Sequence, residues 1–313
     1  MSVDDFIHTI YPVNAGPSIA ALPSNSDNYA TPYIAWTDHQ HNILVAEAYF
    51  DNLGTASRVK APFFVLRNKS IVQCKYAPSL ASYKGKIYMA WVGQDRKELF
   101  IGELVSPTLS TLAWTITNEI KLEVPSDAQI ANSPSLFVFE DDTLSVTYPL
   151  GKNYNNELLF VKDVHLPGVV GGWPLYNVFT EHATANYGNY IAYINGGKLL
   201  FGIIRSADGG VFEVDNINLL IDSNTKAHLV QVSPSLVQRA DGAVIVFCLV
   251  SNLPVGQNVC AIIYSGPPII LNEENPGLGT SNTPAFCVSG ATFVAWRSSA
   301  DNNLCVGILD LIS

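Results

Sequence analysis

Apolar positions along this chain come in short runs separated by polar turns, and they do not follow helical spacing. Residues 76–105 show the pattern: three apolar runs are separated by the turn Tyr-Lys-Gly-Lys and by the polar loop Gly-Gln-Asp-Arg-Lys-Glu. Short apolar runs bounded by turn residues predict β-strands. We therefore expect three strands joined by two tight connections in this stretch.

The same pattern occurs six times along the chain. A Pro-Ser pair or its equivalent opens each copy, and an aromatic residue ends the second apolar run. The opening positions are Pro17, Pro78, Pro134, Ala183, Pro234 and Pro284, and the aromatic positions are Trp36, Trp91, Tyr148, Tyr193, Phe247 and Trp296. A unit of about 50 residues with several short strands has the size of a propeller blade.

The copies before the sixth also contain a fourth, looser strand after the third apolar run, for example at residues 112–122 and 209–221. The sixth copy ends after its third strand, and residues 5–13 precede the first copy. We therefore expect an all-β, six-bladed β-propeller of four-stranded blades, one domain over residues 1–313, with the N-terminal strand completing the last blade and closing the ring. Two packed β-sandwiches are the alternative. That arrangement does not explain why the opening position occurs six times.

The order of strands predicts which face carries function. Loops between the second and third strands share a face with the connections between blades, and these loops are polar and varied in sequence. The second-to-third-strand loops concerned span residues 37–42, 92–98, 149–157 and 297–303. Variable loops on a rigid frame commonly hold binding residues, so we place the functional face there.

Three tryptophans occupy equivalent positions beside these loops. In one interpretation they pack between neighbouring blades; in the other they offer a ring to sugars, whose hydroxyls bond the polar groups nearby. The second interpretation gives this set of ligand-binding residues: Trp36, Asp38, His39, Trp91, Asp95, Arg96, Trp296, Arg297 and Asp301. One shallow site in each of several blades would suit a multivalent binder.

An enzyme would need carboxylates near the central channel, and the innermost strands contain none. The nearest alternative catalytic residues are Glu181 and His182, in the copy that has Ala183 in place of the opening proline. Ordinary drift of the repeat is the other explanation of that difference. His39 and His41 would point to one side of an extended segment, but further ligands are not evident. We expect no metal and no cofactor.

Charge excludes some partners. Among 313 residues, 17 are Lys or Arg without any run of them, and the formal net charge is −10, so we expect no nucleic-acid partner. No apolar run is long enough to insert in a membrane, and the N-terminus lacks a basic region followed by an apolar one. The expected location is the cytoplasm, or outside the cell after release without a recognisable signal peptide.

The cysteines add little chemistry. They are odd in number and lack CxxC spacing, which predicts reduced, mostly buried thiols, with a Cys248–Cys260 bridge between neighbouring strands as the alternative. They are Cys74, Cys248, Cys260, Cys287 and Cys305.

The repeated unit, Ser-Pro-Ser-Leu, a turn glycine, an apolar run ending in Ala-Trp, then Gly-x-Leu, resembles blades of bacterial and fungal propellers with lectin-like or sialidase-like folds. Ser206, Asp208 and Gly210 also match part of the sialidase Asp-box, a structural turn, without its Thr-Trp ending. The resemblance implies a soluble multivalent lectin for glycans or glycoproteins, of open oligomeric state. A propeller glycoside hydrolase with a site at the channel mouth and a protein-interaction or toxin-component propeller are the alternatives.

Overall fold

The computed structural model consists almost entirely of β-strands. One short 3-10 helix, Lys152–Tyr154, is its only helical element within the described residues. The structure describes residues 2–23, 30–50, 56–108, 110–165, 172–207, 211–221, 228–229, 233–238, 242–252, 256–263, 268–270, 284–289 and 291–310. Asp208 and Gly210 of the Asp-box-like segment lie outside these ranges.

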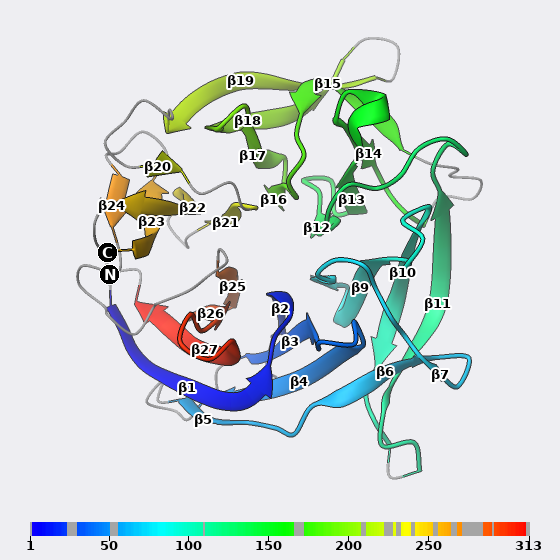
Figure 1. The fold of residues 1–313 in the computed structure, drawn as a ribbon, viewed down its shortest axis with the longest axis vertical. Coiled ribbons are helices and arrows are strands. Elements are labelled where there is room, and N and C mark those ends of the chain that lie inside the picture. The colour runs from blue at the N-terminus through cyan, green and yellow to red at the C-terminus, as the bar shows by residue number, and fades with distance from the viewer. Residues whose placement is uncertain are drawn as a thin grey trace.

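The described strands form four hydrogen-bonded sheets of 4, 10, 8 and 5 strands, and we divide these sheets into units that follow the copies seen in the sequence (Figure 1). Unit 1 contains β2 (Ala15–Leu22), β3 (Thr31–Thr37), β4 (Ile43–Phe50), β5 (Ala56–Val59) and β6 (Phe63–Arg67). Unit 2 contains β8 (Ser79–Tyr83), β9 (Lys86–Val92), β10 (Glu98–Val105) and β11 (Trp114–Glu123), after the short β7 (Ser70–Ile71). Unit 3 contains β12 (Ser135–Val138), β13 (Leu144–Pro149), β14 (Glu157–Val161) and β15 (Trp173–Phe179).

The second half of the chain repeats this arrangement. Unit 4 contains β16 (Ala185–Tyr187), β17 (Tyr190–Asn195), β18 (Lys198–Ser206) and β19 (Phe212–Ile221). Unit 5 contains β20 (His228–Leu229), β21 (Ser235–Gln238), β22 (Val244–Asn252), β23 (Gly256–Ile263) and β24 (Pro268–Ile270). Unit 6 contains β25 (Ala285–Ser289), β26 (Ala291–Arg297), β27 (Asn303–Asp310) and β1 (Ser2–Pro12).

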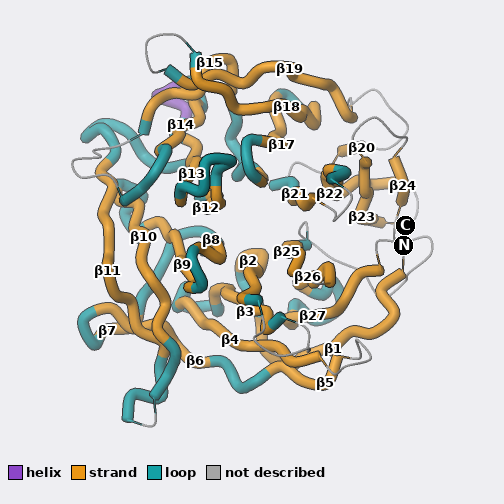
Figure 2. Tube along the Cα trace, turned by 180° about the vertical axis from the view of Figure 1, so that it is seen from behind, coloured by secondary structure: helices purple, strands orange, loops and turns teal. Residues whose placement is uncertain are grey.

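The units are arranged around a common axis, and Figure 2 shows the same arrangement from behind. The innermost strands are β2, β8, β12, β16, β21 and β25. Each innermost strand contacts the innermost strands of the units before and after it, and β25 contacts β2. At the rim, parallel pairing of β6 with β11 and of β15 with β19 joins units 1 and 2 and units 3 and 4.

The N-terminal strand lies beside the last strand of the chain. β1 pairs antiparallel with β27, with Phe6 opposite Gly307 and His8 opposite Cys305. The predicted pairing of residues 5–13 with the third strand of the sixth copy is therefore confirmed. It gives unit 6 a fourth strand that is remote from the other three in the sequence.

Apolar side chains fill the spaces between neighbouring units. One core cluster contains residues of units 1 and 2, and others join units 2 and 3, 3 and 4, and 4 and 5. Between units 5 and 6, the rings of Phe247 and Phe286 stack with centroids 3.8 Å apart. A unit buries both faces of its sheet only with its neighbours, which is why the pattern must repeat.

Glycine in the third strand allows a close approach of the fourth. A Cβ atom on Gly102 of β10 would lie 2.4 Å from Ile116 Cγ2 of β11, and one on Gly202 would lie 2.4 Å from Val214 Cγ1. Both glycines coincide with a shift of register between their strands. The recurrent glycine therefore marks a position where the twisted outer strand crosses closely.

The serine of the Pro-Ser pair links one unit to the next. Ser18 Oγ accepts a hydrogen bond from the backbone N–H of Leu80 at 2.8 Å, and Ser79 Oγ accepts one from Leu136 N–H at 2.9 Å. The Ser235 hydroxyl donates instead to the carbonyl of Pro284. In these units, the repeated serine holds neighbouring inner strands together.

We expect Ser79→Ala to lower the free energy of unfolding by about 1–2 kcal/mol, because the Leu136 N–H would lose its acceptor at a part-buried junction. Urea unfolding followed by circular dichroism measures the change. Ser70→Ala, at an exposed position on β7, is the matched control and should leave the midpoint unchanged. Equal midpoints for both variants would contradict the linking role.

Cys74, Cys248 and Cys305 are buried, as expected, and burial raises the pKa of the Cys305 thiol to about 12. Cys248 lies opposite Cys260 in the pairing of β22 with β23. The Cys260 side chain is outside the described part of the structure, so the bridge stays a prediction.

Among the described residues, no helix is long and apolar enough to cross a membrane.

Candidate functional site

The three tryptophans of the predicted sugar site belong to the core. Trp36 and Trp296 are 0% exposed and Trp91 is 1% exposed, so none offers a ring face to a ligand. Trp36 packs in a cluster with residues of the last unit, Trp91 stacks on Phe100 at 5.3 Å, and Trp296 lies 5.6 Å from Phe6. Their predicted role in stacking on sugars is wrong, and the packing interpretation is correct.

The three aspartates that follow these tryptophans bond to their own turns. Asp38 Oδ1 accepts from the backbone N–H groups of Gln40 and Asn42. Asp95 Oδ1 accepts from the backbone N–H of Lys97, and Asp301 Oδ1 accepts from that of Asn303. These are Asx-type turns, in which a carboxylate replaces a backbone acceptor. The repeated aspartate is explained by the turn.

The segment Asp38–Asn42 is a turn, so the expectation that His39 and His41 share one side of an extended strand is wrong. His41 has a φ of 63°, and its Nδ1 lies 3.5 Å from Asn14 Nδ2. His39 is exposed. In the part of the chain that the structure describes, His, Cys, Asp and Glu side chains form no group of three or more placed to hold a metal.

Arg297 connects the last unit to the first. Its Nη1 donates to the carbonyl of Asn14 at 3.0 Å, and its Nε and Nη2 donate to Asn302 Oδ1 at 3.0 and 2.6 Å. A guanidinium held by three hydrogen bonds has a fixed orientation. Arg297 is therefore a rigid positive group at the junction of units 6 and 1.

A groove of about 640 Å³ lies between units 2 and 3 on the face where we expected function. Both kinds of loop line it: the second-to-third-strand loops of units 2 and 3, and the connections that lead into units 3 and 4. Its lining residues are Arg96, Lys97, Ser126–Ile130, Ala131, Gly151, Asn153, Tyr154, Asn156 and Glu181. Of the predicted ligand-binding residues, Arg96 lies here.

The polar groups of the groove are paired with one another across units. The Tyr154 hydroxyl donates to Asp127 Oδ1, and Asn156 Nδ2 donates to Glu181 Oε1 at 3.1 Å. The hydrogen bond to Asp127, and burial second, raise the pKa of Tyr154. The phenol therefore stays protonated at neutral pH and keeps the Asp127 carboxylate in place.

Sequence reasoning missed Tyr154, Asp127 and Asn156 as site residues. Their loops lie on the predicted functional face, but the repeated pattern singles out the tryptophans that precede such loops. Chemically the groove combines an aromatic ring, two carboxylates, three side-chain amides, an ammonium group and a guanidinium. These are the groups that bond hydroxyls and cover the C–H face of a polar ligand.

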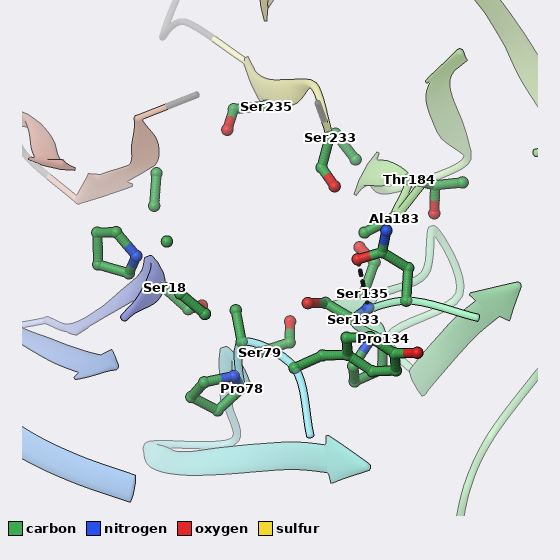
Figure 3. Close-up of a pocket in the computed structure, with 18 of the residues that line it drawn as sticks. Ser18, Pro78, Ser79, Ser133, Pro134, Ser135, Ala183, Thr184, Ser233 and Ser235 are labelled. Atoms are coloured by element: carbon green, nitrogen blue, oxygen red, sulfur yellow. Dashed lines mark hydrogen bonds between the residues drawn. The ribbon is translucent and has the colours of Figure 1, made fainter. Parts of the chain in front are cut away.

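The inner strands surround a second hollow, a central cavity of about 460 Å³ (Figure 3). The Pro-Ser segments line it, so hydroxyl groups predominate on its wall. Residues with hydroxyl side chains in the lining are Ser18, Tyr76, Ser79, Ser133, Ser135, Thr184, Ser233 and Ser235. The absence of acids from the inner strands, noted in the sequence, makes this cavity distinct from the groove.

Glu181 and His182, the alternative catalytic residues, line different hollows. Glu181 borders the groove, whereas His182 borders the central cavity. Burial lowers the pKa of His182, and the neighbouring Glu181 partly opposes this effect. The structure therefore does not bring the two side chains together on one cavity as an acid–base pair.

Comparison with known proteins gives a likeness in structure only. No family model matches this chain, and no curated protein matches it. Among solved structures, a mutant of the lectin from Aleuria aurantia, in complex with alpha-methyl-L-fucoside, matches with 11% identity and a TM-score of 0.57, over 94% of this chain and 95% of that one. AofleA from Arthrobotrys oligospora matches with 9% identity and a TM-score of 0.57, over 98% and 86%.

An enzyme matches in the same way. The alpha-L-arabinofuranosidase Arb93A from Fusarium graminearum, in complex with an iminosugar inhibitor, has 11% identity and a TM-score of 0.52, over 98% of this chain and 96% of that one. These neighbours are propellers, and the likeness extends over nearly the whole chain. The fold of this chain is therefore of the β-propeller class.

Proposed function

We propose that this chain is a single six-bladed β-propeller domain, closed by its N-terminal strand, that binds carbohydrate without catalysis in the groove between units 2 and 3. The contacts of each inner strand with two neighbours and the pairing of β1 with β27 support the blade count and the closure. The partners are glycans or glycoproteins.

The paired polar groups of the groove carry the proposal. Asp127 and Glu181 are each held by a donor from the loop of unit 3, so their remaining oxygen lone pairs face a hollow of ligand size. Sugar hydroxyls are donors that need such acceptors, and Arg96 and Asn156 supply donors in return. The fucoside named for the Aleuria lectin structure supports a sugar as ligand.

A glycoside hydrolase is the second candidate. The groove contains two carboxylates, which glycosidic hydrolysis requires, and the neighbouring arabinofuranosidase shares the fold. In that case Asp127 and Glu181 would be the acid and the base or nucleophile. His182 would have no part, since it borders the other cavity.

A glycan array probed with labelled protein tests the first candidate. We expect selective binding that weakens about tenfold or more in Asp127→Ala and in Tyr154→Ala, the loss of one or more hydrogen bonds to a ligand. Glu213→Ala removes an exposed carboxylate from the rim strand β19 and should bind like the parent protein. A blank array from folded protein would contradict carbohydrate binding.

Incubation of the array-positive glycan with the protein separates binding from catalysis. Chromatography should recover the glycan intact if the groove is a binding site. The hydrolase would be favoured over the lectin if the parent protein releases sugar and the Glu181→Gln variant binds the glycan but releases none.

A further inference from the structure

The central cavity has a basic lining. Lys75, His182 and Arg297 border it, and no carboxylate is among the described residues that do so. The chain as a whole carries a formal net charge of −10. A hollow with cations and without acids therefore differs in sign from the protein around it and favours negative ligands.

The polar wall of the cavity is uneven. The residue just before the opening position is Ser133 in unit 3, His182 in unit 4 and Ser233 in unit 5, but Gly16 in unit 1 and Ala77 in unit 2. Figure 3 shows the side chains of Ser133 and Ser233 pointing into the cavity. At this position, units 3 to 5 therefore carry side-chain donors, whereas units 1 and 2 carry small residues.

Two serines of the wall also have hydrogens to donate. Ser18 Oγ and Ser79 Oγ act as acceptors for backbone N–H groups of the next unit, and this uses only a lone pair. Each hydroxyl hydrogen remains for a ligand. Ser235 is different, since its hydroxyl donates to the carbonyl of Pro284.

We propose that the central cavity binds a small oxyanion, the carboxylate, sulfate or phosphate group of a small molecule, through Lys75, Arg297, His182 and the serine hydroxyls. Charge-assisted hydrogen bonds to such a group are about twice as strong as neutral ones. Asn14 and Asn302 already hold Arg297 in one orientation, so its side chain loses little conformational entropy when a ligand binds. This site is separate from the groove of the proposed function.

His182 makes the binding depend on pH. The charged group that acts on its ring is Glu181, and the other charged residues that line the same cavity are Lys75 and Arg297. Because burial lowers its pKa, the imidazole is neutral at pH 7.5 and becomes a cation only as pH falls. An anion in the cavity favours the charged form, so binding tightens as pH falls from 7.5 to 5.5.

Isothermal titration calorimetry of the full chain tests the proposal, at ionic strength kept constant with sodium chloride. The probes are sodium sulfate, sodium glucuronate and glucose. We expect sulfate and glucuronate to compete for one site and glucose, which lacks the carboxylate, to give no heat. Sulfate binding without glucuronate binding would assign the site to a free inorganic anion and exclude a carboxylate.

Matched variants locate the site. Lys75→Ala should weaken sulfate binding about tenfold, and Lys86→Ala, which removes an exposed lysine outside the cavity lining, should not. His182→Ala should remove the tightening at low pH. Equal losses in Lys75→Ala and Lys86→Ala, or no binding of either anion, would overturn the proposal. Asp127→Ala in the groove should retain sulfate binding. The proposed anion site and the proposed carbohydrate site are therefore tested independently.

Discussion

Replacing Trp36 with alanine is expected to lower the free energy of unfolding by about 3–5 kcal/mol. The ring is fully buried, and it packs with Phe293 and Leu304 of unit 6 as well as Ile19 of its own unit. Its removal leaves a cavity at the junction of the first and last units. Urea unfolding followed by far-ultraviolet circular dichroism measures the loss without relying on tryptophan fluorescence.

Two further variants make the test specific. Trp36→Phe keeps an aromatic ring and removes an indole N–H that has no partner among the described residues, so it should cost less than Trp36→Ala. Trp173→Ala removes a ring that is 63% exposed and should change stability by less than about 0.5 kcal/mol. A Trp36→Ala protein of unchanged stability that lost glycan binding would reinstate the sugar-stacking role.

The strands of this fold can be predicted from the sequence because buried positions give the same apolar pattern in each copy. The fourth strands expected at residues 112–122 and 209–221 correspond to β11 and β19, and the expected N-terminal strand corresponds to β1. These predictions used alternation, turn residues and comparison among copies. Such signals are local or occur in several copies. A single sequence is therefore enough to predict the strands.

The candidate site was harder to predict because its geometry is not local. An aromatic residue followed by a polar loop has the same pattern whether the ring is buried below the loop, as Trp91 is, or exposed beside it. Asp127 and Tyr154 meet because units 2 and 3 are neighbours, and neither residue recurs in the other copies. The linking role of Ser79 likewise becomes visible only when the next inner strand is in place.

A chain that lacks residues 2–12 is expected to lose cooperative folding. β1 pairs with β27 along most of its length, Phe6 packs against Trp296, and the Thr9 hydroxyl donates to the carbonyl of Leu304 at 2.8 Å. Removing it exposes β27 as an unpaired strand edge and uncovers the core beneath. The loss should approach the whole stability of an ordinary domain, about 5–15 kcal/mol. Urea unfolding should show no sharp transition, and light scattering should show aggregation.

Adding the missing strand as a separate peptide distinguishes loss of closure from general damage. A peptide with the sequence of residues 2–12 can supply hydrogen bonds to β27 and the Phe6 ring to Trp296, as strands do when they complete a sheet in trans. It should restore a cooperative transition and keep the truncated chain monomeric. A peptide of the same composition in scrambled order should not, because the register that places Phe6 opposite Gly307 is lost. A truncated chain that unfolds like the intact one without any peptide would contradict closure by the N-terminal strand. The inner contacts of the sixth unit with β2 and β21 would then have to stabilise it without a fourth strand.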